Sequence, residues 1–303
     1  MNDSETREDR LRLCLAAWWE ANARDLPWRF GRTGAWGVLV SEVMSQQTQM
    51  SRVVPYWRSW MSVWPDAATL AGASTAEVIT AWGRLGYPRR ALRLQECARQ
   101  VVDRYGGALP REYDELVDLP GIGDYTASAV LSFAFGRRVP VIDTNIRRVL
   151  SRAVAGKESL GGSASAEDRR FAPPGLPRGA PAPGGGNQSV MELGAVICTA
   201  QTPVCEQCPI AGECAFRAAG YPDLGRKRTR PRQRFAGTDR QVRGIVLAAL
   251  RNASAAGSDH SGISRAETER LWADHGQLDA CIASLDEDGL IDIRPDGSLT
   301  LPR

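Results

Sequence analysis

The chain has 303 residues, of which 43% are hydrophobic, and a formal net charge of +3. This composition excludes a disordered chain, and the length allows about two domains with a large core. No apolar run is long enough to span a membrane, and the charged N-terminal segment MNDSETREDR is unlike a secretory signal. Seven cysteines, an odd count without a signal peptide, argue against a disulfide framework. We therefore expect a folded protein of the reducing cytoplasm.

Helix-period patterns dominate the chain, and strand patterns are sparse. Apolar residues recur every three or four positions, which predicts amphipathic helices. Ser74 followed by Glu77 is typical of a capping box that starts one of them. The expected helices cover residues 8–22, 36–46, 75–86 and 89–105, with a further one that reaches about Trp64 and is interrupted near Pro55.

The stretch around PGIG (residues 120–123) has the pattern of two helices joined by a tight glycine turn. Its two glycines lack a Cβ, so the backbone can adopt positive φ and point its amide groups outward. Amides at the start of the next helix, from Asp124 on, would bind a phosphate. Further along, Asp143 precedes a helix expected over residues 144–155, where its simplest interpretation is an N-cap.

Glu42 lies on the apolar side of the expected 36–46 helix, four residues after Val38 and three after Leu39. An ionised carboxylate on an apolar face is costly unless it is paired or its pKa is raised. Two interpretations stay open: a structural ion pair, or a general acid that remains protonated near neutral pH.

Four cysteines near residues 198–214 are spaced C-x6-C-x2-C-x5-C. Thiolates in this number suit either a structural zinc ion or an iron–sulfur cluster. The chain has only two histidines, both far from this segment, so a mixed Cys/His site is not expected. The spacing predicts metal binding and leaves the choice of metal open.

Two segments interrupt the helical pattern. Residues 161–186 are rich in Pro and Gly and are typical of a flexible or polyproline-like linker, after which the helix pattern resumes at Ser189. Six Arg and Lys residues within 226–234 form either a solvated linker or a phosphate-contacting arm.

The last part of the chain, residues 237–303, has the pattern of a small separate domain. Helices are expected over residues 241–252, 264–274 and 278–286, followed by a β-hairpin over 290–301. Three helices and a hairpin indicate a winged-helix module.

Seven motifs follow one another between about residues 20 and 220. They are LPWR (26–29), SEVMSQQTQ (41–49), LGY (85–87), LPGIGDYTASAV (119–130), VIDTNIRRVLSR (141–152), NQSVMELGAVIC (187–198) and the four-cysteine spacing. Together they resemble the helix–hairpin–helix, endonuclease III-like superfamily of DNA glycosylases. Within it the chain is similar to the MutY-type adenine glycosylases, in a short actinobacterial-like form without a Nudix domain.

The resemblance implies a mainly α fold with four parts. A six-helix barrel (31–139) carries the hairpin, and residues 1–30 with 140–222 form an iron–sulfur module. A basic linker (223–236) and a winged-helix-like α/β domain (237–303) follow. Because the cysteine spacing matches the family's cluster loop, the resemblance assigns a [4Fe–4S] cluster to Cys198, Cys205, Cys208 and Cys214.

The resemblance also implies residue roles. Glu42 corresponds to the catalytic acid and Asp143 to the catalytic aspartate, with Tyr125 and Asn145 positioning them. Bifunctional relatives carry a lysine where this chain has Tyr125, which cannot form a Schiff base, so a monofunctional enzyme is expected. The implied DNA-binding residues are Gln46, Gln47, Thr48, Tyr87, Gly121, Ile122 and Gly123, and the implied adenine pocket contains Trp28, Arg29 and Gln188.

The implied partner is double-stranded DNA with adenine opposite 8-oxoguanine or guanine. The enzyme would flip the adenine out and hydrolyse its N-glycosidic bond. We expect a monomer in the bacterial cytoplasm, associated with the nucleoid.

Three features depart from the family pattern. Residues 237–303 are too short for a Nudix-like domain, so recognition of oxidised guanine would rest on the catalytic half or on the small C-terminal domain. Ser45 stands where the family usually has leucine. Residues 161–186 replace a helix of the cluster-bearing module, which predicts a less stable module.

Two rival functions remain. A pyrimidine-lesion glycosylase and lyase of the endonuclease III type would need a lysine at the position of Tyr125. A non-catalytic DNA-binding or redox-sensing protein would not need both Glu42 and Asp143.

Overall fold

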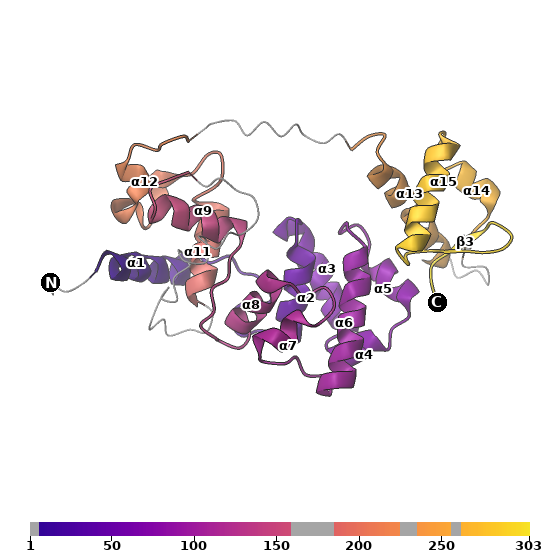
Figure 1. The fold of residues 1–303 in the computed structure, drawn as a ribbon, viewed down its shortest axis with the longest axis horizontal. Helices are drawn as coiled ribbons and strands as arrows, with labels where there is room; N and C mark the ends of the chain where they lie inside the picture. The colour runs from indigo at the N-terminus through magenta and orange to yellow at the C-terminus, as the bar shows by residue number, and fades with distance from the viewer. Residues whose placement is uncertain (1–5, 159–184, 225–234, 256–261) are drawn as a thin grey trace. The chain divides into compact units, whose positions relative to one another are not determined.

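The computed structural model describes residues 6–158, 185–224, 235–255 and 262–303. The chain forms two compact units. Unit 1 consists of Met1–Glu42, Pro110–Asp118 and Ile122–Arg228, and unit 2 of Val43–Leu109, Leu119–Gly121 and Thr229–Arg303. Both units are built mainly from helices, as Figure 1 shows, which confirms the predicted fold class. The domain limits expected from the sequence stay a prediction.

Unit 1 buries apolar faces of helices that are distant in the sequence. Leu15 of the N-terminal helix, Val149 and Leu193 lie in one core, to which each helix contributes apolar residues three or four positions apart. The helices are α1 (Arg7–Asn22), most of α2 (Ala35–Ser45), α7 (Tyr113–Val117), α8 (Asp124–Phe133), α9 (Thr144–Ala153), α11 (Gly185–Val196) and α12 (Ala215–Ala218), with short 3-10 turns η1 (Cys205–Gln207) and η2 (Ala211–Glu213).

Helix α11 begins at Gly185, earlier than the predicted resumption at Ser189. The N–H groups in the first turn of a helix have no intrahelical acceptor. Glycine therefore destabilises a helix less in this turn than in the helix interior. Asn187 holds this turn in place, because its Nδ2 donates to Ser132 Oγ at 2.9 Å and to the Val139 carbonyl at 2.8 Å. The rest of the predicted Pro/Gly-rich segment, up to residue 184, lies outside the described residues.

Unit 2 contains α3 (Met50–Val63), α4 (Ala67–Ala71), α5 (Thr75–Trp82), α6 (Arg89–Tyr105) and the C-terminal elements. The predicted interruption of α3 at Pro55 is wrong, since the helix runs through this residue. Proline removes one N–H hydrogen bond. Packing compensates, because Trp60 on the same helix contacts Trp64 and Trp82 edge to face, with ring centroids 4.6 and 5.6 Å apart. The capping box of Ser74 and Glu77 forms as predicted.

The C-terminal module, residues 237–303, contains α13 (Asp239–Ala255), α14 (Arg265–Glu269), α15 (His275–Glu287) and three short strands. Strands β1 (Gly262–Ile263) and β2 (Asp292–Ile293) both pair antiparallel with β3 (Leu299–Thr300). Strand β1 was not predicted, and α14 is shorter than the predicted helix over 264–274, because a two-residue strand and a one-turn helix leave almost no periodic pattern. The predicted hairpin between β2 and β3 is present.

The core of the C-terminal module is not separate from the rest of unit 2. Ile79 of α5 is fully buried in one cluster with Val242, Val246 and Leu285 of the module, and Leu92 of α6 packs against the same cluster. This shared core is the reason why the module and α5 belong to one compact unit. None of the described helices is both long and apolar enough to cross a membrane.

A buried ion network joins two segments of unit 1. Glu192 of α11, with no exposed side-chain surface, accepts hydrogen bonds from Arg24 Nε at 2.6 Å and from Arg29 Nη2 at 2.8 Å. Burial alone would raise the pKa of this carboxyl, but the hydrogen bonds from both arginines lower the pKa to about 2. Trp19 covers the Arg29 guanidinium, with 4.8 Å between the guanidinium carbon and the ring centroid.

We expect Glu192→Ala to destabilise the protein by about 3–5 kcal/mol, because Arg29 would be left buried without its counter-ion. Urea denaturation of the cluster-containing protein would measure this loss. Glu112→Ala is the matched control, since Glu112 forms an exposed pair with Arg137 and should cost less than about 1 kcal/mol. Equal losses in the two variants would contradict the structural role of the network.

Candidate active site

Glu42 is buried near the end of α2, with 8% of its surface exposed. The Tyr125 hydroxyl, from α8, donates a hydrogen bond to Glu42 Oε2 at 2.7 Å. Burial raises the pKa of Glu42 to about 7. The hydrogen bond from Tyr125 and the charge of Arg29 act in the opposite direction, whereas the charge of Asp143 raises the pKa further. Glu42 is therefore a buried carboxyl with a raised pKa and a hydroxyl partner, and its role as a general acid stays a prediction.

Asp143 is the N-cap of α9, and the same carboxylate acts on Glu42 through its charge. Its Oδ1 accepts the Ile146 amide at 2.6 Å, and its Oδ2 accepts Asn145 Nδ2 at 2.9 Å. Burial raises the pKa of Asp143, while these hydrogen bonds lower it. The cap and the candidate catalytic group are thus one side chain, held in a fixed orientation.

Arg148, one turn into α9, supports Asn145 and was missed by the sequence analysis. Its Nη2 donates to Asn145 Oδ1 at 2.6 Å and to the Gly194 carbonyl at 2.6 Å, and its Nε donates to the Cys198 carbonyl at 2.7 Å. A Cβ on Gly194 would lie 2.7 Å from Asn145 Cβ, so this close approach requires glycine. The only sequence signal was the spacing of Arg148, three residues after Asn145 on the same helix face.

The three residues expected in an adenine pocket also lie in unit 1. Trp28 and Arg29 are buried in the turn that precedes α2, and Gln188 lies half-buried in the first turn of α11. Arg29 acts on Glu42 only through its charge, because its hydrogen bonds go to Glu192 and to the Arg24 carbonyl. Glu192, which was not singled out from the sequence, therefore fixes the position of the Arg29 guanidinium through their ion pair.

In unit 2, Arg90 of α6 organises the loop that contains the expected DNA-binding residues. Its Nη1 donates to the carbonyls of Val43 at 2.8 Å and Gln46 at 2.6 Å, and its Nη2 donates to the Gly86 carbonyl at 3.0 Å. Gln47 and Tyr87 both have left-handed backbone, with φ of 55° and 48°. Such conformations are unfavourable for residues other than glycine, and the Arg90 hydrogen bonds hold them. Thr48 lies beside Gln47 and donates its hydroxyl to the Gln46 carbonyl at 3.2 Å.

In the glycine turn after α7, Gly121 has a left-handed backbone and Gly123 does not. Gly121 has φ +79°, and a Cβ there would lie 3.0 Å from Arg93 Cβ. Gly123 has ordinary extended backbone at φ −104° and is the N-cap of α8, so the expectation of positive φ does not apply to it. The Ile122 side chain is buried, which leaves only its backbone to face a ligand.

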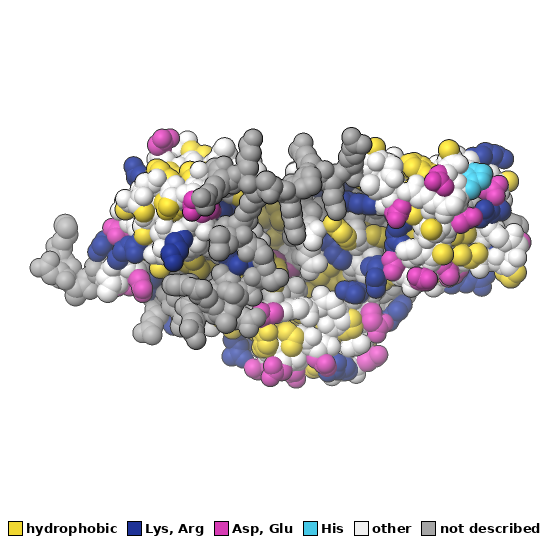
Figure 2. Space-filling view, turned by 45° about the horizontal axis from the view of Figure 1, so that its top comes forward, with side chains coloured by type: hydrophobic (Ala, Val, Ile, Leu, Met, Phe, Trp, Pro, Cys, Tyr) yellow, Lys and Arg dark blue, Asp and Glu magenta, His cyan; other side chains and the backbone are white. Residues whose placement is uncertain are grey.

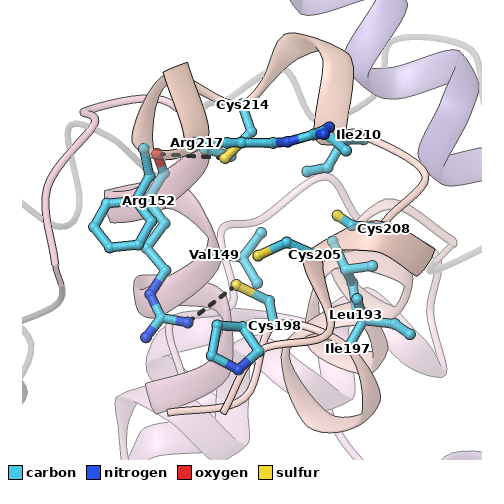
Figure 3. Close-up of a pocket in the computed structure, with 14 residues that line it drawn as sticks. Val149, Arg152, Leu193, Ile197, Cys198, Cys205, Cys208, Ile210, Cys214 and Arg217 are labelled. Atoms are coloured by element: carbon cyan, nitrogen blue, oxygen red, sulfur yellow. Dashed lines mark hydrogen bonds between the residues drawn. The ribbon is translucent and has the colours of Figure 1, made fainter. Parts of the chain in front are cut away.

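The four clustered cysteines line one cavity of unit 1, together with apolar side chains such as Val149 and Ile210 (Figure 3). Burial raises the pKa of the Cys208 thiol to about 11, and the other three cysteines act on it electrostatically. Among the residues that the structure describes, no group of three or more His, Cys, Asp or Glu side chains is arranged to hold one metal ion. Thiols distributed around a cavity suit a cluster, which is larger than a single zinc ion.

Arg152 brings a guanidinium to this cavity, where it is also paired with the Glu158 carboxylate at 2.8 Å. The guanidinium is buried against the Phe216 ring, and its Nη1 donates to Cys198 Sγ at 3.5 Å and to the Thr199 carbonyl at 2.7 Å. A cation beside a thiolate ligand offsets the negative charge of an iron–sulfur cluster. The donor set and its surroundings therefore fit the predicted cluster.

Comparisons with known proteins show the family of the chain. Residues 40–170 match the family of HhH-GPD superfamily base excision DNA repair proteins, and residues 198–214 match the iron–sulfur binding domain of endonuclease III. The second match confirms the predicted iron–sulfur cofactor. In fold, the chain is similar to a thermostable thymine-DNA glycosylase, with a TM-score of 0.60, 25% identity and coverage of 72% of this chain and 100% of the other. A trapped endonuclease III–DNA covalent intermediate gives a TM-score of 0.56 at 22% identity, over 70% of this chain and 98% of the other, which shows the fold alone.

The most informative relatives in sequence are adenine DNA glycosylases. The chain is 46% identical to that of Mycolicibacterium smegmatis over 288 residues, which are 95% of this chain and 94% of the relative. It is 44% identical to that of Mycobacterium tuberculosis over 95% of this chain and 92% of the relative. The human protein of the same name is 44% identical over 68% of this chain and 39% of its own length. Identity of this extent over nearly the whole length of a relative shows that the chain belongs to the adenine DNA glycosylases of the helix–hairpin–helix base excision repair superfamily.

Proposed function

We propose that the enzyme excises adenine paired with 8-oxoguanine or guanine in duplex DNA by hydrolysing the N-glycosidic bond. One observation carries this proposal. A buried glutamic acid, Glu42, hydrogen-bonds Tyr125 and has a pKa of about 7, next to a second carboxylate, Asp143, that is held as a helix cap. Two carboxyl groups in different environments are what an acid-assisted glycosidic cleavage requires.

In the first step, protonated Glu42 donates its proton to N7 of the adenine. The hydrogen bond from Tyr125 occupies Oε2, which leaves Oε1 to carry the proton. Protonation lets the C1′–N9 bond break with its electron pair going to the base, so neutral adenine leaves instead of an anion. The sugar passes through an oxocarbenium-like cation that the Asp143 carboxylate stabilises. Water then adds to C1′ and loses a proton, which produces an abasic site.

The target base must leave the helix stack before Glu42 can reach it. We propose that Tyr87 and Gln46 fill the space beside the flipped nucleotide, with Gln47 and Thr48 facing the opposite base. The backbone amides of Gly121, Ile122 and Gly123 would hold a nearby phosphate. Trp28, Arg29 and Gln188 would line the pocket of the adenine. Support for these roles comes from the family motifs that contain the residues.

The cluster, when bound by Cys198, Cys205, Cys208 and Cys214, supplies iron–sulfur bonds that hold the loop of residues 198–214 together. Arg152 and Arg148 connect this loop to α9, the helix that Asp143 caps. We propose that the enzyme acts as a monomer on DNA of the bacterial nucleoid.

Glu42→Gln should lose most base excision, by about 10²–10⁴-fold, while binding mispaired DNA as before, because Gln keeps the shape of Glu but carries no transferable proton. Single-turnover excision and an equilibrium binding assay would measure the two effects. The control is Glu96→Gln, an exposed residue of α6, which should change neither. Excision by Glu42→Gln close to that of the unchanged enzyme would overturn the role of Glu42.

Glu42→Gln should also be more stable than the unchanged enzyme at alkaline pH. Glu42 has a folded pKa of about 7, above its ordinary value of 4.5, so its contribution is complete below about 4.5 and is lost as pH rises through 7. The lost contribution amounts to up to about 3 kcal/mol, and Gln does not undergo this loss. The difference in Tm between the variant and the unchanged enzyme should therefore grow between about pH 5 and about pH 8. A constant difference across this range would contradict the raised pKa.

The product strand should stay intact until alkali is added, because Tyr125 cannot attack the sugar as an amine. The substrate is a duplex with one adenine opposite 8-oxoguanine, and the same duplex with guanine or thymine opposite the adenine tests the choice of mispair. Cleavage without alkali would indicate a lyase, and no cleavage at all would indicate a protein that only binds DNA.

A further inference from the structure

Two guanidinium groups from different parts of unit 2 lie over the ring of Tyr87. Arg90, at the start of α6, and Arg240, at the start of α13, each have their guanidinium carbon 5.4 Å from the ring centroid. Arg240 also lies over Phe235, at 5.8 Å. Tyr87 is 47% exposed and its backbone is left-handed. A residue of the C-terminal module is therefore in contact with the side chain that we propose to enter the duplex.

The two arginines differ in what else they bind. Arg90 donates to three backbone carbonyls and is half-buried. Arg240 is exposed, and in the part of the chain that the structure describes it has ring contacts but no carboxylate partner. Two other arginines of the module are paired, Arg243 with Asp288 and Arg265 with Asp279. The charge of Arg240 is thus available to an anionic ligand.

Arg240 is not needed to seat the C-terminal module. The shared core around Ile79 does this, together with the hydrogen bond from Arg251 Nη1 to the Gly83 carbonyl at 2.9 Å and the ion pair of Arg89 with Asp288 at 3.1 Å. These contacts hold the module against α5 and α6, so the contact of Arg240 with Tyr87 joins two parts of the chain that already share a core.

A further exposed cation, Arg93, lies on α6, the helix of Arg90. Arg93, one turn after Arg90, packs its aliphatic stem beside Gly121 of the glycine turn. In Figure 2, Lys and Arg side chains gather where the C-terminal module meets α5 and α6. Exposed guanidinium groups beside a left-handed tyrosine and a glycine turn fit an anionic backbone, because arginine binds phosphate through paired N–H donors.

We propose that the C-terminal module is part of the DNA-contacting face, and that Arg240 both clamps Tyr87 and binds a phosphate of the duplex next to the mispair. Stacking on the ring limits the orientations of Tyr87, and the outer N–H groups of the same guanidinium remain free for a phosphate oxygen. This inference rests on the proposed function, because it takes Tyr87 to be a residue that enters the DNA.

The test is Arg240→Gln in the cluster-containing full chain, which removes the charge and keeps a long polar side chain. Binding to a duplex with adenine opposite 8-oxoguanine is measured over a range of salt concentrations. We expect affinity to fall about tenfold, as for loss of one charge-assisted contact, and the slope of log K against log [salt] to decrease in magnitude by about 1. The Tm should stay unchanged, since Arg240 is exposed and outside the shared core.

Arg270→Gln is the matched control, because Arg270 is an exposed arginine of the same module without a ring contact to Tyr87 among the described residues. If Arg240→Gln binds like Arg270→Gln, the inference fails. In a Tyr87→Ala background the effect of Arg240→Gln should shrink, and strictly additive losses would overturn the clamp. The proposed function is judged separately by whether the unchanged enzyme excises adenine from this duplex, so failure of one is distinguishable from failure of the other.

Discussion

The distribution of positive charge between two buried glutamates is the constraint on which the candidate active site depends. Glu192 holds the guanidinium groups of Arg24 and Arg29, and the pKa of this carboxyl is lowered to about 2. Glu42 accepts a hydrogen bond from the Tyr125 hydroxyl, and burial raises the pKa of Glu42 to about 7. If Arg29 paired with Glu42 instead, the pKa of Glu42 would be lower, and a smaller fraction of the proposed acid would be protonated at neutral pH. The ion network on α11 therefore influences the pKa of a residue on α2.

In unit 1, the N-cap of a helix orients a candidate catalytic side chain. Asp143 caps α9, so the backbone amide of Ile146 orients the carboxylate without any additional element. Arg148 then holds Asn145 and reaches the carbonyl of Cys198, a residue of the cluster loop. The consequence is that the helix start, the candidate catalytic carboxylate and the cysteine-lined cavity belong to one hydrogen-bonded arrangement.

In unit 2, exposed residues such as Tyr87 lie beside helices that share a buried core. Arg90 fixes the backbone around Gln46 and Tyr87, and the C-terminal module shares its core with α5 through Ile79. A module seated in this way can contribute to the surface around Tyr87, where a flexibly tethered domain could not hold a defined contact. The same core explains why this module does not form a compact unit of its own.

The family motifs, the helix periods, the capping residues and the cysteine spacing could be read from the sequence, because these are local patterns that a short window of residues contains. Glu42 and Asp143 could also be singled out, although spacing alone left a structural ion pair open for Glu42 and a helix cap open for Asp143. The contacts of Glu42 with Tyr125, of Glu192 with Arg29 and of Arg240 with Tyr87 could not be predicted without the fold. These partners are 83, 163 and 153 positions apart in the chain, so their contacts and the resulting pKa values exist only after the helices have packed.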